Sequence, residues 1–202
     1  MNTPPPIPDS LRQMMAEFGP IWGEKIREHT RIQSAAFSEI LFDAPKIGTV
    51  TRDIPYGRDA RHVLDIYMPT GAVKVPVIVF AHGGAFVEGQ KDRTEEIHAN
   101  VGWYFTRNGV AFVNIEYRLA PAHPYPSAVE DVGAAVAWVR ANIGALGGDA
   151  DNVFVMGHSA GGAHAGCYAY NRRFHPAEGS GVRGLIVVSG RLRIDTLPEN
   201  PN

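Results

Sequence analysis

The 202-residue sequence predicts an α/β fold built on a mostly parallel sheet with helices on both faces. Continuous apolar runs, typical of strands that are buried on both sides, alternate with segments whose apolar residues recur at helical spacing. Such alternation favours parallel strands joined by right-handed helical crossovers. The sequence contains no internal repeat, low-complexity tract or interdomain linker, so we expect an N-terminal helical segment over residues 1–48 and one core over residues 49–202.

Two helices are predicted within residues 1–48. After a proline-rich lead, Asp9 or Ser10 is suited to cap a first helix, whose apolar residues recur at helical spacing. A second helical segment is predicted to begin near Ile21. Because these helices would present an apolar face, we expect them to dock on another part of the protein.

The sheet is predicted to begin near Thr49. The segments "VTRDIPYG" and "HVLDIYMP" alternate in polarity and are interpreted as antiparallel edge strands, the second ended by Pro69. Buried strands are predicted in "VPVIVFAHGG", "GVAFVNIEYR", "NVFVMGHS" and "VRGLIVVSG". Helices are predicted in "TEEIHANVGWYFTRN", "DVGAAVAWVRANIGALGGD" and "AGGAHAGCYAYNRRF".

Composition argues against several classes of function. The chain is 45% hydrophobic and 20% charged with a formal net charge of −2, so no basic excess favours nucleic acid or an anionic membrane as a partner. It carries no signal-peptide pattern and no apolar run long enough to span a bilayer, and a cytoplasmic location is expected. The lone Cys167 cannot form an internal disulfide and is interpreted as a buried structural thiol.

The segment "GHSAGG" places Ser159 between Gly157 and Gly161 in a G-x-S-x-G pattern. Because this pattern follows an apolar strand and precedes a small-residue helix, it is typical of a nucleophile elbow, in which a sharp, strained turn lifts the serine Oγ above the sheet. A Cβ at either glycine would strike the neighbouring strand or helix. The amide of Ala160 would point into the same space. A glycine-rich turn with a capping serine is the alternative interpretation.

The histidines near this serine are not expected to act as its base. His158 lies on the wrong side of the tight turn to reach the Oγ of Ser159, and we expect a structural role for it. His164 is predicted to be a packing or surface residue of the following helix. His175 is predicted to cap the end of that helix, where a cation is favoured.

A second motif, "FAHGGAFVEG", follows the first buried strand. Acyl transfer places negative charge on a carbonyl oxygen, and backbone N–H groups aimed at that oxygen stabilise it. Gly83 and Gly84 leave their amides uncovered, and with Ala160 they are predicted to form an oxyanion hole. His82 is predicted to hold the loop through side-chain hydrogen bonds. Taken alone, the motif is also compatible with a plain turn at the end of a strand.

Three motifs in this order, "HGGAF", "EYRLAPAHPYPSAVEDV" and "GHSAGG", resemble the carboxylesterase branch of the α/β-hydrolase fold that includes bacterial relatives of hormone-sensitive lipase. The resemblance covers roughly residues 49–190 and implies the α/β-hydrolase fold, with residues 1–48 as a helical cap over the pocket. Ala85 is an accepted variant in the family's loop. Arg118 and Asp131 are expected to be buried partners that anchor the "YRLAP" loop.

The sequence departs from that family in its C-terminal part. In the fold, the triad order is Ser, then Asp or Glu, then His, and the acid and base follow later strands. Only one strand is predicted after Ser159, the sole later aspartate past that strand is Asp195, and no histidine follows His175. We therefore expect the family's last strands to be absent from this chain, the acid and the base to lie beyond residue 202, and the 202-residue chain alone to be inactive.

The function predicted from the motifs is a serine carboxylesterase that hydrolyses small, short-acyl esters through an acyl-enzyme on Ser159. This chemistry requires no metal and no organic cofactor. Its predicted partner is a small-molecule ester, and a homodimer is possible. Two alternatives stay open: an arylformamidase-like amide hydrolase, which a formamide substrate would distinguish, and a catalytically dead, hydrolase-like small-molecule-binding protein, which would not react with a fluorophosphonate.

Overall fold

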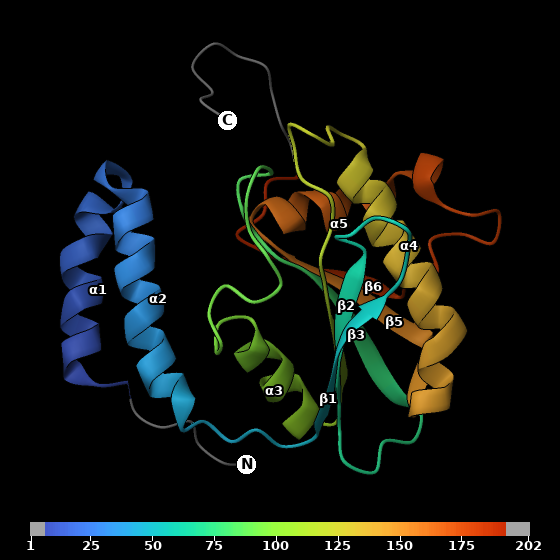
Figure 1. The fold of residues 1–202 in the computed structure, drawn as a ribbon, viewed down its shortest axis with the longest axis horizontal. Coiled ribbons are helices and arrows are strands. Elements are labelled where there is room, and N and C mark those ends of the chain that lie inside the picture. Colours follow the sequence, from blue (N-terminus) through green and yellow to red (C-terminus); the bar gives the residue numbers. More distant parts are fainter. Residues whose placement is uncertain (1–6, 193–202) are drawn as a thin grey trace.

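The sheet forms the centre of the computed structural model, which describes residues 7–192 (Figure 1). In that part of the chain six strands lie in the spatial order β1-β2-β4-β3-β5-β6. β2 is antiparallel to both β1 and β4, whereas β4, β3, β5 and β6 are parallel neighbours, so the predicted mostly parallel sheet is confirmed. The strands are β1 (Thr49–Pro55), β2 (Val63–Met68), β3 (Val75–Ala81), β4 (Ala111–Ile115), β5 (Gly148–His158) and β6 (Gly184–Val188).

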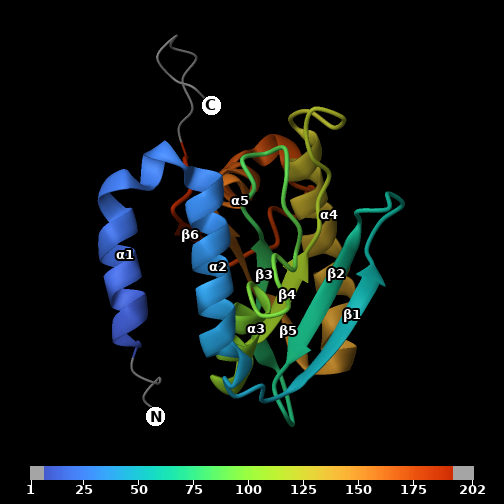
Figure 2. The same ribbon diagram turned by 60° about the vertical axis from the view of Figure 1, so that its left-hand side comes forward.

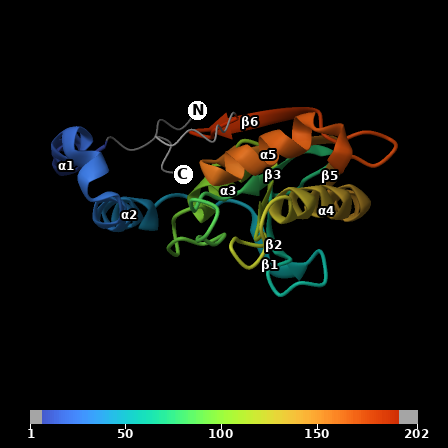
Figure 3. The ribbon, with the colours of Figure 1, turned by 90° about the horizontal axis from the view of Figure 1, so that it is seen from above.

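Helices cover both faces of the sheet, as predicted, because successive residues of each strand point to opposite faces. Val77 and Val79 belong to the core that packs under α4 and α5, whereas Ile78 and Phe80 belong to the core that packs under α3. Figure 1 shows α3 and α4 on opposite sides of the strands, and Figure 3 shows α4 and α5 side by side. The helices are α1 (Asp9–Ile21), α2 (Ile26–Phe42), α3 (Ala99–Arg107), α4 (Ser127–Asn142) and α5 (Ala160–Tyr170), with short 3-10 turns at Trp22–Glu24, Ile143–Leu146 and Arg172–Phe174.

The position of β2 differs from the prediction. Its antiparallel pairing with β1 is confirmed, but β2 lies between β1 and β4 and is not an edge strand. The polarity that suggested exposure comes from Asp65, which is fully buried. Its carboxylate pairs with Lys91 Nζ at 2.9 Å and with Arg52 Nη1 at 3.0 Å, and this pairing makes burial tolerable.

The helix predicted from Thr94 begins only at Ala99. Thr94 Oγ1 accepts hydrogen bonds from the backbone amides of Glu96 at 3.3 Å and Ile97 at 3.0 Å, and His98 has a φ of 79°. The positive φ of His98 lies outside the α-helical region, so no helix can run from Thr94 through His98. The segment before Ala99 is therefore a polar turn.

The last strand, β6, was predicted to be buried and is only partly so. Ile186 is 37% exposed and Val188 is 39% exposed. Within residues 7–192, β6 pairs with β5 alone and forms the second edge of the sheet, which leaves these side chains exposed.

Of the two N-terminal helices, α2 lies beside α3 and the segment before it, and α1 lies on the far side of α2 (Figures 1 and 2). Ser38 of α2 hydrogen-bonds Thr94 at 2.7 Å, and Lys46 pairs with Glu96 at 2.8 Å. The predicted cap at Asp9 or Ser10 was wrong, because α1 begins after Pro8 without a side-chain cap. The second helix begins at Ile26 and not near Ile21. The role of residues 1–48 as a cap stays a prediction. None of the helices within the described chain has the length and apolar character that a bilayer span requires.

The aromatic core under α3 yields a stability prediction. Phe112 is fully buried, and its ring centroid lies 5.4 Å from that of Phe80 and 5.7 Å from that of Phe105. Phe112→Ala is expected to lower the free energy of unfolding by about 3–5 kcal/mol in urea denaturation, because it leaves a cavity. Val73→Ala, at a site that is 81% exposed, should stay within about 0.5 kcal/mol of the parent. Equal effects of the two substitutions would contradict the described core.

Candidate active site

Ser159 is the single residue between β5 and α5. Its backbone has φ 51° and ψ −120°, a conformation that costs a non-glycine residue about 1–3 kcal/mol. Hydrogen bonds hold it on both sides: its amide donates to Val188 O at 2.9 Å, and its carbonyl accepts from the Gly162 amide at 2.9 Å. The strained strand-turn-helix geometry predicted for the serine is present.

The two flanking glycines have no room for a side chain. A Cβ at Gly157 would lie 2.2 Å from Gly161 O, within the first turn of α5. A Cβ at Gly161 would lie 2.2 Å from Ala81 O and 2.4 Å from His82 O, at the end of β3. Since all these atoms belong to the backbone, they cannot move aside cheaply, and the predicted steric need for glycine is confirmed.

The loop that follows β3 lies directly against the serine. β3 and β5 are parallel neighbours with Ala81 opposite Gly157, so both motifs leave the sheet at the same edge. A Cβ at Gly83 would lie 3.0 Å from Ser159 Cβ. Gly84 begins a tight turn in which its carbonyl accepts from the Glu88 amide at 2.9 Å. The two motifs that the sequence separates are therefore adjacent in space.

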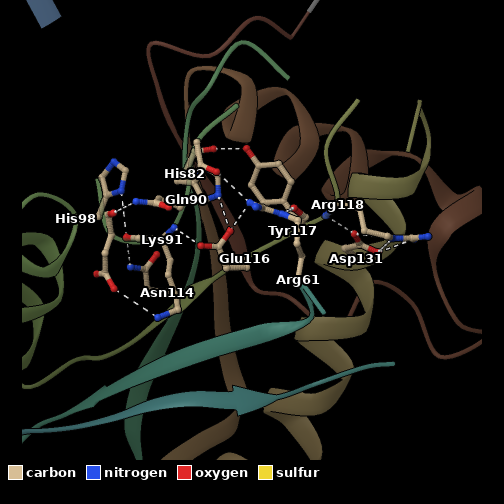
Figure 4. A network of polar contacts seen from close by, with 12 residues as sticks. Arg61, His82, Gln90, Lys91, His98, Asn114, Glu116, Tyr117, Arg118 and Asp131 are labelled. Carbon is tan, nitrogen blue, oxygen red and sulfur yellow. Dashed lines mark hydrogen bonds and ion pairs between the residues drawn. The ribbon is translucent and has the colours of Figure 1, made fainter. Parts of the chain in front are cut away.

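His82 is fully buried beneath this loop (Figure 4). Its Nδ1 donates to Gly83 O at 2.9 Å. Its ring stacks on that of Tyr117 at a centroid distance of 4.5 Å, and the Tyr117 hydroxyl donates to His82 O at 2.5 Å. These contacts hold the loop to the end of β4, in agreement with the structural role predicted for His82.

No histidine of the described chain hydrogen-bonds the Oγ of Ser159. His158 is half-buried, and its pKa is lowered by burial and by Arg93 and His82. His175 Nε2 donates to Tyr168 O at 2.5 Å, near the end of α5 as predicted. Asp195 lies outside the described residues. Within residues 7–192, no histidine is therefore hydrogen-bonded to Ser159 as a triad base would be.

His164 is buried, so its predicted packing role is correct and the surface alternative is wrong. Its ring meets those of Phe86 and Tyr117 edge to face, each at a centroid distance of 5.3 Å. Burial lowers its pKa to about 4. Its ring is packed among aromatic side chains, and it makes no hydrogen bond to Ser159.

The predicted pairing of Arg118 with Asp131 is confirmed, but only Asp131 is buried, since the Arg118 side chain is 23% exposed. The Arg118 guanidinium contacts the Asp131 carboxylate at 2.6–3.0 Å, and the Arg118 amide donates to the same carboxylate at 2.8 Å. His62 Nε2 lies 3.0 Å from Asp131 Oδ1 and is a third partner that the sequence did not indicate.

A cavity of about 860 Å³ runs along α5, from Ala163 to Tyr170, and Ser159 is not among the residues that line it. Phe86 of the loop after β3 and Tyr125 contribute aromatic walls. Cys167 lines it, with its Sγ 3.7 Å from the Tyr125 hydroxyl, and is half-buried; the prediction of a buried thiol was therefore wrong. Cys167 packs partly against the core beneath α4 and α5, and the cavity leaves its other side open. Over residues 7–192, no group of three or more His, Cys, Asp or Glu side chains is arranged to hold a metal ion.

The sequence analysis missed a group of charged residues beneath the loop. Glu116, which follows β4, pairs with Arg61 and accepts the Lys91 amide at 2.7 Å. The signal available in the sequence was a carboxylate at the end of the apolar segment "AFVNIEY", since a buried charge requires partners.

A mostly parallel sheet with an elbow serine and a glycine loop at the same edge defines a protein of the α/β-hydrolase fold. The chain belongs to the BD-FAE family, whose model matches residues 64–181. It is 36% identical to Esterase LipC of Mycobacterium tuberculosis, over 69% of this chain and 36% of the relative. It is 42% identical to Carboxylesterase NlhH of the same species, over 44% of this chain and 27% of the relative. The predicted resemblance to carboxylesterases is confirmed.

A solved structure, the hyperthermophilic esterase from the archaeon Pyrobaculum calidifontis, matches 96% of this chain with a TM-score of 0.70 and 28% identity. The match covers 62% of that chain. Our chain thus spans about a third of the length of the curated relatives named above.

The contact of Gly161 with β3 yields a prediction. Gly161→Ala should lower the free energy of unfolding by several kcal/mol, or prevent folding, because the new methyl group would overlap two backbone carbonyls. Gly144→Ala is the matched control, since a Cβ there meets nothing within 4 Å. Thermal and urea unfolding of both variants would measure the difference. A Gly161→Ala variant as stable as Gly144→Ala would contradict the close approach.

The buried histidines predict a loss of stability in acid. Burial lowers the pKa of His98 and of His164 to about 4, below the ordinary value of 6.5. Between these values the unfolded chain binds more protons than the folded one, so the free energy of unfolding should fall as the pH drops from about 6.5 to 4. His164→Gln should remove roughly 1–3 kcal/mol of this fall in urea titrations. An unchanged pH dependence in His164→Gln would contradict the assignment.

Proposed function

We propose that the protein is a serine carboxylesterase that hydrolyses small, short-acyl esters through an acyl-enzyme on Ser159. The observation that carries this proposal is the contact between the two motifs: a Cβ at Gly83 would lie 3.0 Å from Ser159 Cβ. The positive φ of 51° at Ser159 adds to it, because such strain persists where the surrounding structure enforces it. Relatives named as esterases support the same reaction class.

In the proposed mechanism, Ser159 Oγ attacks the ester carbonyl and the resulting oxyanion is held by the amides of Gly83, Gly84 and Ala160. Ala160 opens α5, so its amide contributes at the positive end of the helix dipole. Removal of one such donor from a serine hydrolase costs about 2.7–4 kcal/mol of transition-state stabilisation. The glycines at 157 and 161 allow the turn, and His82 and His158 support the loop and the turn from below.

A serine hydroxyl is a weak nucleophile without a base. We propose that the histidine and the acid that complete the triad lie outside the described residues. The histidine would take the proton from Ser159 Oγ during attack and give it to the leaving alcohol, and the acid would orient the histidine. No step of this reaction passes through a metal or an organic cofactor. A cytoplasmic location and a homodimer stay predictions.

Labelling of Ser159 tests the proposal. In the whole protein, a fluorophosphonate should label Ser159, and p-nitrophenyl acetate should be hydrolysed. Ser159→Ala should abolish the labelling and lower kcat for p-nitrophenyl acetate by at least about 10³-fold. Ser189→Ala is the matched control, because Ser189 follows β6 at the same edge of the sheet with a similar φ of 51°, and it should change neither result.

Two outcomes would count against the esterase. Faster turnover of N-formylkynurenine than of any acyl ester would favour the arylformamidase alternative. An unlabelled Ser159 in a folded whole protein, together with tight binding of a small molecule, would favour the inactive binding protein.

A further inference from the structure

A buried carboxylate lies directly beneath the loop that carries Gly83 and Gly84 (Figure 4). Glu116 is 8% exposed and follows the last residue of β4. Its Oε1 accepts the Lys91 amide at 2.7 Å, and its Oε2 accepts from Arg61 Nη2 and lies 3.4 Å from His82 Nε2. One carboxylate therefore faces both ends of the loop, at His82 and at Lys91.

Burial alone would raise the pKa of Glu116, but contacts with His82, the Lys91 amide and Arg61 together lower it below its ordinary value. The group therefore stays ionised at neutral pH. An ionised acid in this position binds its donors more strongly than a neutral one.

His82 transmits this contact to a peptide bond of the proposed oxyanion hole. Its Nδ1 donates to the carbonyl of Gly83 at 2.9 Å. In a trans peptide the carbonyl and the following N–H point in opposite directions, so the bond that fixes Gly83 O toward His82 also aims the Gly84 N–H away from it. The orientation of the His82 ring thus sets the direction of one proposed oxyanion donor.

Arg61 closes the other side of the loop. Its Nη2 donates to Gly89 O at 3.0 Å and its Nε to Tyr117 O at 2.6 Å. A Cβ at Gly89 would lie 2.5 Å from Gly83 O and 2.9 Å from His82 Nδ1, so Gly89 packs directly on the bond between His82 and Gly83. Displacement of Arg61 or Glu116 would release this packing.

We propose that Glu116 is a positioning residue of the active site: through His82 and the Lys91 amide it fixes the Gly83–Gly84 peptide so that the Gly84 N–H is presented to the oxyanion. The inference rests on the proposed function, because it takes the Gly84 amide as an oxyanion donor. Glu116, which is not a member of the triad, would then contribute to binding of the transition state. A purely structural ion pair would not do so.

Asp131 provides a matched control for Glu116. Like Glu116, it is buried (1% exposed), accepts a backbone amide, pairs with an arginine and faces a histidine. Its arginine and histidine are Arg118 and His62, and neither belongs to the loop that carries Gly83 and Gly84. Glu116→Gln and Asp131→Asn should therefore cost similar stability, while only Glu116→Gln should disturb the loop.

The test measures hydrogen exchange and kinetics on both variants in the whole protein. Glu116→Gln should speed exchange of the Val87 and Glu88 amides, which bond to Gly84 O, by at least about tenfold, and Asp131→Asn should not. Glu116→Gln should also lower kcat about 10- to 100-fold with KM within about twofold, because the loss falls on the transition state. The double variant with His82→Asn should be no slower than the slower single variant, since the two residues act as one unit.

Several results would overturn the inference. One is a folded Glu116→Gln variant with parental loop exchange and kcat, and another is an equal effect of Asp131→Asn on loop exchange. If Glu116→Gln does not fold, nitrogen NMR of the parent decides: both ring nitrogens of His82 must carry a proton, because Gly83 O and the Glu116 carboxylate can only accept. An unprotonated Nδ1 or Nε2 would refute the proposed link. A third outcome separates the two proposals. If only Glu116→Gln speeds exchange of the loop amides, but Ser159 of the whole protein does not react with a fluorophosphonate, the esterase is refuted and the role of Glu116 in holding the loop stands.

Discussion

The active edge of this protein depends on one contact between two stretches of backbone. The first turn of α5 lies so close to the end of β3 that a Cβ at Gly161 would sit 2.2 Å from Ala81 O. Because β3 and β5 are parallel neighbours, this approach brings the two loops that leave their carboxyl ends together. The serine and the glycine loop are adjacent for that reason, and every chemical role suggested for them presupposes it.

This contact has a conformational cost, which the surrounding structure meets with hydrogen bonds. Ser159 adopts a positive φ that a serine disfavours, yet its amide and its carbonyl are both bonded, to β6 and to α5. On the other side, His82 and Glu116 tie the glycine loop to β4. A strained nucleophile and a loop with few side chains are thus held between fixed neighbours, and this preorganisation is what electrostatic stabilisation of an oxyanion requires.

Much of the fold and the core of the site followed from the sequence, because they depend on local patterns. Buried parallel strands are continuous apolar runs, and the elbow and the loop have fixed glycine spacings. Long-range pairing has no such signal. Asp65 made β2 resemble an exposed strand because its partner Lys91 is 26 residues away, and Glu116 pairs with Arg61 across 55 residues. The start of α3 was missed because His98 adopts a positive φ, which the apolar spacing does not indicate.

The central claim is that the side chain of Ser159 and the amides of two separate loops face one point. A crystal structure of the whole protein with Ser159 phosphonylated tests it most directly, because the phosphonyl oxygen occupies the place of the oxyanion. We expect the phosphonyl oxygen to lie about 3 Å from the amide nitrogens of Ala160 and of Gly83 or Gly84. An adduct whose oxygen points to solvent, away from the glycine loop, would contradict it.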